Sequence, residues 1–148
     1  MRLGREVVLR ASPPQVWTVL WDVPRIVACV PGCLEARELE PGRRWEARMS
    51  QRVGPIVLSL PLLVATVEVE GPRRLALEAS GRDPLVGASV SMRVRLVLEP
   101  IGSGTRLTID ADARVLGKLG ALGHSVIQRK GEEALEEFVE CLRRTVEG

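Results

Sequence analysis

An alternation of apolar and polar residues, interrupted in one strand, recurs between Leu34 and Val115 and limits the possible folds of this chain more than any other feature. In the run RRWEARMSQ, Trp45, Ala47 and Met49 share one parity, and most of the other parity is charged. The runs SMRVRLVLE and TRLTIDADARV repeat the pattern. Successive side chains of a strand point to opposite faces, so a period of two indicates β-strands. One apolar and one charged face indicate an antiparallel sheet with one side in water.

Turn signals divide this segment into strands. Glycine and proline interrupt the alternation at short, regularly spaced sites, which are typical of hairpin connections. These sites are Pro41-Gly42, Gly54-Pro55, Gly71-Pro72, Asp83-Pro84 and Gly102 to Gly104. The pattern therefore predicts a meander of six strands.

The residues before the meander predict one strand and two short helices. Residues 5–10 (REVVLR) have strand composition. In the following segment Ser12 can cap a helix, Pro13 suits the first helical position and Gln15 can complete a capping box. A second cap followed by proline predicts another short helix over residues 23–29.

Residues 119–145 predict a long amphipathic helix, because apolar residues recur there at spacings of three and four. The order strand, two short helices, six strands and long helix predicts an α+β helix-grip fold. In this architecture a curved antiparallel sheet of about seven strands wraps a C-terminal helix. A chain of 148 residues matches one domain, spanning residues 1–148.

Composition narrows the cellular setting and the class of partner. Three cysteines, no signal-peptide pattern and no run of 18 apolar residues predict a soluble, cytoplasmic protein with reduced cysteines that needs no disulfide. The net charge is only +2, the arginines are spaced singly, and aromatic residues are scarce. Nucleic-acid binding, which requires a clustered basic face with stacking aromatics, is therefore not expected.

The cysteines and the single histidine offer little chemistry. A zinc site needs three or four ligands, and the chain has only Cys29, Cys33, a distant Cys141 and His124. Cys29 is expected at a helix end, where the helix dipole raises a thiol pKa rather than lowering it. Packing around the turn is the favoured role for Cys29 and Cys33, and we expect no metal and no cofactor.

Several motifs resemble one family. They are the PGC turn at Pro31 to Cys33, the pair Gly104-Thr105, and the Gly-Lys-Leu-x-x-Leu-Gly run at Gly117 to Gly123. Nearly the whole chain resembles the carbon monoxide dehydrogenase G-subunit (CoxG) family of the START-like, polyketide-cyclase-like (SRPBCC) superfamily. The resemblance implies an apolar cavity for a lipid or quinone. It also implies a non-catalytic, accessory role beside the subunits of a molybdenum hydroxylase, with at most peripheral contact at the inner membrane face.

Side-chain size supports a hollow interior, because inward positions include Ala47, Ala111 and Ala113 and the long helix opens with glycines. An empty apolar cavity of about 300 Å³ would cost on the order of 7 kcal/mol. We therefore expect either a hydrophobic guest or collapse of the helix onto the sheet; an ordinary packed core is the alternative. The expected rim residues are Lys118 and His124. The expected cavity lining is Trp17, Trp45, Ala47, Met49, Leu60, Leu75, Leu77, Met92, Val94, Leu96, Leu107, Ile109, Ala111, Leu119, Leu122, Gly123, Val126, Ile127 and Phe138.

Two other functions are compatible with this sequence. A cyclase- or hydratase-like enzyme would have to use His124, the one side chain with an ordinary pKa near neutrality. No inward acid or base is evident as its partner, so no catalytic residue is assigned. A pure interaction module with a filled core is the third possibility.

The strand over residues 56–70 breaks the alternation, because both parities are apolar as far as Val64, apart from Ser59. Pro61 cannot donate a ladder hydrogen bond, which predicts an edge strand or a bulge and leaves open which parity faces inward. An exposed patch of Val57, Leu62 and Leu63 would suit another protein. With no basic cluster beside it, the patch favours a homodimer or partner contact over a membrane.

Overall fold

Seven antiparallel strands form one sheet in the order β1-β7-β6-β5-β4-β3-β2 in the computed structural model, which describes residues 1–148. The strands are β1 (Arg2–Leu9), β2 (Cys33–Glu40), β3 (Arg44–Val53), β4 (Ile56–Glu70), β5 (Arg74–Asp83), β6 (Ala88–Ile101) and β7 (Gly104–Gly117). The helices are α1 (Pro13–Trp21), α2 (Val23–Ala28), the 3₁₀ helix η1 (Lys118–Leu122) and α3 (His124–Glu147).

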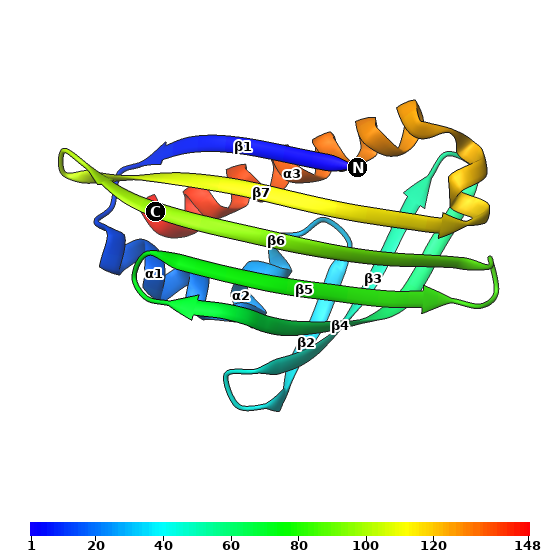
Figure 1. Ribbon diagram of the computed structural model, residues 1–148, viewed down its shortest axis with the longest axis horizontal. Coiled ribbons are helices and arrows are strands. Elements are labelled where there is room, and N and C mark those ends of the chain that lie inside the picture. Colours follow the sequence, from blue (N-terminus) through cyan, green and yellow to red (C-terminus); the bar gives the residue numbers. More distant parts are fainter.

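The sheet is strongly curved. Figure 1 shows β1, β7, β6 and β5 running along the length of the molecule, while β2 and β3 cross them at a steep angle. The long strand β4 joins the two parts and carries a bulge between Thr66 and Glu68, where its register with β5 shifts. A bulge bends a strand and increases its twist. The sheet therefore folds over α3, and the helix-grip fold predicted from the sequence is confirmed.

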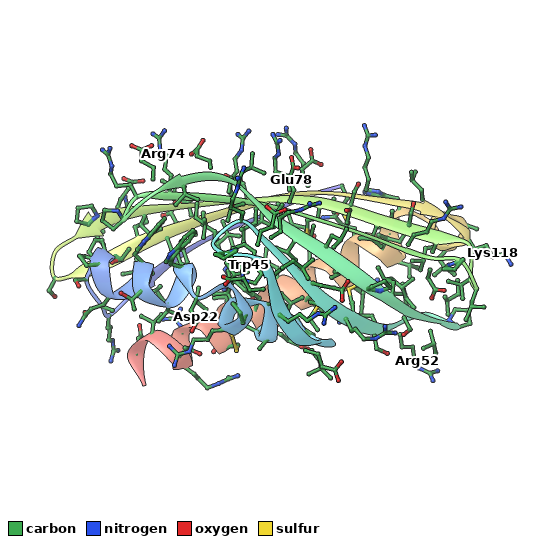
Figure 2. The ribbon with its side chains drawn as sticks, turned by 90° about the horizontal axis from the view of Figure 1, so that it is seen from below. Asp22, Trp45, Arg52, Arg74, Glu78 and Lys118 are labelled. Atoms are coloured by element: carbon green, nitrogen blue, oxygen red, sulfur yellow. A yellow bond between two sulfur atoms is a disulfide. The ribbon has the colours of Figure 1, made fainter.

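The alternation sets the two faces of this sheet. Trp45 is buried and lies between sheet and helices, whereas Arg74 and Glu78 project from the outer face (Figure 2). The inner face packs against α1 and α2 and against the second half of α3, where Val139 and Leu142 are fully buried. The packed core thus occupies the part of the molecule that contains these helices.

The N-terminal helices follow their predicted caps. The Ser12 backbone N–H donates to Gln15 Oε1 at 2.9 Å, and Gln15 N–H donates to Ser12 Oγ at 3.4 Å, so the capping box is complete. Helix α2 ends one residue earlier than predicted, at Ala28.

The long helix begins later than predicted. A single helix was expected from Leu119, but the structure has η1 first and starts α3 at His124. Gly117 and Gly123 have φ angles of 86° and 93°, in the left-handed region that favours glycine. At the first of these glycines the chain turns away from β7, and Lys118 N–H donates to Gly87 O at 3.1 Å. The spacing of apolar residues could not reveal this later start, because it depends on the backbone angles of the two glycines.

Strand β4 lies inside the sheet, between β3 and β5, so the prediction of an edge strand is wrong. The strand does carry a bulge, which was the other prediction, but the bulge lies between Thr66 and Glu68 and not at Pro61. Pro61 pairs with Arg48 of β3, and the ladder between β4 and β5 ends at Leu63, before the proline is reached. Leu62 is buried, so it is not available to an external partner as expected. Val57 and Leu63 are exposed.

The cysteines also differ from expectation. Cys29, at the end of α2, forms a disulfide with Cys141 of α3, and their Cα atoms are 5.4 Å apart. This finding corrects the prediction of three reduced cysteines. The sequence did not reveal the pair, because 112 residues separate two cysteines that only the fold brings together. Cys33 is free and buried. No helix combines the length and the apolar character needed to cross a membrane.

Candidate ligand-binding site

A cavity of about 230 Å³ lies between the inner face of the sheet and the first half of α3. Of its 21 lining residues, 18 are hydrophobic. The strands, the loops and η1 contribute 15 of the 21: Met1, Leu3, Val30, Met49, Gln51, Val53, Leu58, Val90, Met92, Val94, Ile109, Ala111, Ala113, Val115 and Leu119. Helix α3 contributes the other six: Ile127, Lys130, Gly131, Ala134, Leu135 and Phe138.

Small side chains on both walls keep this space open. Ala111 and Ala113 contribute only methyl groups from β7, and Ala134 does the same from α3. A Cβ added to Gly131 would lie 3.0 Å from Leu3 Cδ1, so this glycine lets α3 approach β1 closely at the cavity edge. The cavity is partly open to solvent, so its apolar walls meet water unless a guest displaces it, and covering them is favourable. The site is therefore suited to an apolar guest.

The two halves of α3 have different surroundings. The second half is fixed by the Cys29–Cys141 disulfide and by Val139 and Leu142 in the core. The first half has no fully buried residue and covers the cavity with half-buried side chains such as Ile127. Helix α3 thus serves as an anchor at its C-terminal end and as a cavity wall at its N-terminal end.

Only two polar side chains line the cavity. Gln51 uses its Nε2 to donate to Pro31 O, which fixes the loop before β2. Lys130 is the one charged side chain of the lining, and no carboxylate lies within ion-pairing distance of its ammonium group. Lysine packs its aliphatic stem on apolar surface while its charged end seeks water. Lys130 can therefore offer a cation to the polar end of a guest.

An open depression adjoins the cavity between β7 and the start of α3. The two share Met1, Ala113, Val115 and Ile127 among their lining residues. His124 and Arg114 line only the depression. The depression therefore borders the cavity at the surface of the molecule.

Eight of the predicted lining residues do line this cavity: Met49, Met92, Val94, Ile109, Ala111, Leu119, Ile127 and Phe138. Seven others are buried in the packed core instead: Trp45, Ala47, Leu60, Leu75, Leu77, Leu96 and Leu107. Trp17 packs on the core and stacks on Trp21, with ring centroids 6.1 Å apart. Leu122 lies against the β3–β4 turn, and Gly123 and Val126 are exposed.

The two predicted rim residues lie at the same end of the molecule but outside the cavity. Lys118 is exposed on η1 (Figure 2), and His124 is exposed in the adjoining depression. Sequence reasoning missed Lys130, which carries the only charge of the lining. Its signal was a lysine three residues after Ile127 on a predicted apolar stripe, where a basic residue is unexpected.

Two buried titratable groups lie away from the cavity lining. Asp83 is 4% exposed and its carboxylate accepts hydrogen bonds from the backbone of Ser59 and Leu85, each at 3.0 Å. The Ser59 hydrogen bond is the main cause that holds the pKa of Asp83 below its ordinary value. Burial raises the pKa of the Cys33 thiol to about 11, so this cysteine is protonated and a poor nucleophile near neutral pH.

Comparisons with known proteins agree with this architecture. A model of the carbon monoxide dehydrogenase G-subunit (CoxG) family matches residues 5–147. A conserved protein from Geobacillus kaustophilus is 18% identical, with a TM-score of 0.88 over 99% of this chain and 95% of its own. The Zhui aromatase/cyclase from Streptomyces sp. R1128 is 18% identical, with a TM-score of 0.68 over 99% of this chain and 93% of its own. At these identities the two structures show a shared fold. The search of curated proteins found no match.

Proposed function

Because the chain belongs to the carbon monoxide dehydrogenase G-subunit (CoxG) family, we propose that it binds a hydrophobic small molecule, a lipid or a quinone, without transforming it. The observation that carries this proposal is the apolar cavity of about 230 Å³ beneath α3. An engineered cavity of about 150 Å³ stays dry and binds benzene. The space here is larger, so it has room for a guest larger than benzene.

The binding role is favoured over catalysis by the position of the titratable groups. His124 lines the outer depression and not the cavity, and no acidic side chain lines either space. General acid–base catalysis needs a positioned donor or acceptor within hydrogen-bonding reach of the substrate. A cyclase- or hydratase-like enzyme using His124 is the alternative, since an aromatase/cyclase shares the fold. Replacing His124 with alanine should leave ligand affinity unchanged if the protein is a carrier.

A larger side chain that fills the cavity would test whether the cavity is the binding site. Ala111→Phe would place a ring in the hollow, and it should abolish binding of decylubiquinone and of lauric acid while leaving thermal stability equal or higher. Ala47 is also buried but does not line the cavity, so Ala47→Phe should overpack the core and lower stability by about 1 to 3 kcal/mol. Binding can be followed by quenching of tryptophan fluorescence and by isothermal titration calorimetry. Unchanged affinity in Ala111→Phe, or no binding by the wild type, would exclude the carrier role.

The family also suggests an accessory role beside the subunits of a molybdenum hydroxylase of the carbon monoxide dehydrogenase type. The exposed side chains of Val57 and Leu63 offer an apolar contact on β4 for one of those subunits or for a second copy of this chain. Light scattering of the wild type and of a Val57→Ser/Leu63→Ser variant tests the homodimer. If both proteins are monomers, Val57 and Leu63 do not form a homodimer contact. Co-purification with the hydroxylase subunits would then test whether these residues contact one of those subunits.

A further inference from the structure

The outer face of the sheet has two parts with different charge patterns. On β5, β6 and β7 the outward arginines have carboxylates on neighbouring strands. Arg93 forms an ion pair with Glu78, and the strand register places Arg95 directly opposite Asp110. Cross-strand pairs of opposite charge stabilise a sheet surface that remains in water. This part of the outer face therefore balances its own charges.

The outer face near the β3–β4 turn lacks this balance. It is here called the β2–β4 face and comprises Leu34, Glu46, Arg48, Ser50, Arg52, Val57, Ser59, Pro61 and Leu63. Its one acidic residue, Glu46, is already paired with Arg37 at 3.3 Å. No carboxylate lies within ion-pairing distance of Arg48 or Arg52. Figure 2 shows Arg52 pointing away from the body of the molecule. The two guanidinium groups are therefore available to a partner.

Exposed apolar side chains lie directly beside these arginines. The register places Arg48 between Leu34 and Pro61, and it places Arg52 opposite Val57. Leu34 is 66% exposed and Val57 is 51% exposed. Contiguous exposed apolar residues mark interaction sites, and arginine is enriched in protein interfaces. The β2–β4 face thus has the composition of a protein-binding surface.

Charge selects the kind of partner. In a dimer with two-fold symmetry the same patch lies on both sides of the interface, so the arginines of one copy would meet those of the other. Like charges brought together at an interface cost affinity. An acidic surface would instead supply the carboxylates that Arg48 and Arg52 lack, and guanidinium groups bind carboxylates through two parallel hydrogen bonds.

We propose that the β2–β4 face is a docking surface for an acidic protein. Arg48 and Arg52 pair with its carboxylates. Leu34, Val57 and Leu63 pack against apolar side chains of the same partner. This inference rests on the accessory role proposed above and assigns the face to a hydroxylase subunit rather than to a second copy of this chain. The cavity lies on the opposite, inner side of the sheet, so docking leaves the cavity accessible to its guest.

Biolayer interferometry tests this proposal, with an immobilised molybdenum hydroxylase encoded in the same genome as the probe. We expect the wild type to bind the hydroxylase and to bind it less tightly as salt is raised, because salt screens exposed charges. The variant Arg48→Gln/Arg52→Gln should bind at least tenfold more weakly and should depend less on salt. Leu34→Ser should weaken binding on the order of tenfold through lost apolar contact.

A matched variant makes the result specific to this face. Arg74→Gln/Arg95→Gln removes the same charge from exposed positions of β5 and β6, and it should bind as the wild type does. Equal losses in the two double variants, or wild-type affinity in Arg48→Gln/Arg52→Gln, would overturn the proposal and leave the accessory role standing. No binding by the wild type would overturn both.

Two further measurements exclude other occupants of the β2–β4 face. Light scattering should show no dimer that Arg48→Gln/Arg52→Gln disrupts, since such a dimer would assign the face to a second copy. Co-sedimentation with phosphatidylglycerol vesicles should be the same for this variant and the wild type, since a selective loss would assign the face to a membrane. Either of those results would overturn the proposal. Affinity for decylubiquinone should be equal in all variants, so the carrier role is judged separately.

Discussion

Asp83 illustrates a buried charge whose role is structural. Its carboxylate bridges the gap where β4 and β5 separate, and backbone hydrogen bonds hold its pKa below the ordinary value of 3.8. A carboxyl group with a lowered folded-state pKa contributes stability that is complete above the unfolded-state pKa and is lost as pH falls through the folded-state pKa.

We therefore expect Asp83→Asn to lower the free energy of unfolding at neutral pH. The NH₂ group of the asparagine would replace one carboxylate oxygen and would face a backbone N–H, so two donors would meet without an acceptor. The difference from wild type should stay constant above about pH 5 and shrink below about pH 4, as the native carboxyl group becomes protonated. Urea unfolding at a series of pH values measures this difference. Asp112→Asn, at an exposed position on β7, is the control. A difference that does not depend on pH would contradict the assigned role.

Lys130 permits a second prediction at the level of one side chain. Lys130→Met keeps an unbranched stem in the cavity wall and removes the ammonium group. Affinity for lauric acid should then fall on the order of tenfold, the loss of one partly solvated charge-assisted hydrogen bond, while affinity for the neutral dodecanol should be unchanged. Calorimetry of both ligands, with the exposed neighbour Arg129→Met as control, measures the effect. Equal losses for the acid and the alcohol would mean that Lys130 acts through packing.

Among the elements, strands were the most predictable from sequence, because one face of the sheet meets water and the other meets the core. Trp45 and Ala47 are buried and Arg48 is exposed, as their parity requires. The bend in β4 was harder to predict from sequence, since a bulge changes which alternate residues face inward and no distinctive residue type marks it. The start of α3 was also misplaced, because Gly123 lies among residues that otherwise keep helical spacing. Local patterns therefore predicted the elements, and backbone geometry decided their ends.

The disulfide between α2 and α3 gives a prediction at the element scale. It closes a loop of 112 residues, and a loop of about 100 residues stabilises the folded state by about 4 to 5 kcal/mol in the chain-entropy account. A reducing agent should therefore lower the urea midpoint of the wild type markedly and leave a Cys29→Ser/Cys141→Ser variant unaffected. Thiol titration in denaturant should count one free cysteine per oxidised chain, Cys33. A count of three would show that the bridge does not form.

For the molecule as a whole, the sequence indicated that the interior contains small residues but not where along the sheet they leave space. Ala47 and Ala111 share the inward parity of their strands, yet Ala47 lies in the packed core and Ala111 faces the cavity. The difference arises because α1, α2 and the second half of α3 fill one part of the interior. That arrangement depends on contacts between segments far apart in the chain, including the unforeseen disulfide. The cavity is thus a property of the assembled fold.

This arrangement predicts an uneven distribution of local stability. Segments with few buried apolar contacts open more readily than the core, so amide hydrogens of residues 124–138 should exchange faster than those of residues 139–147. A guest in the cavity adds apolar contacts to the first segment alone. Saturating decylubiquinone should therefore slow exchange in residues 124–138 and leave residues 139–147 unchanged, as measured by hydrogen–deuterium exchange with mass spectrometry. The Ala111→Phe variant, whose cavity is filled, should show slow exchange in the first segment without ligand and no further slowing on its addition. Protection that appears equally along the whole of α3 would instead indicate global stabilisation, with no special role for the cavity wall.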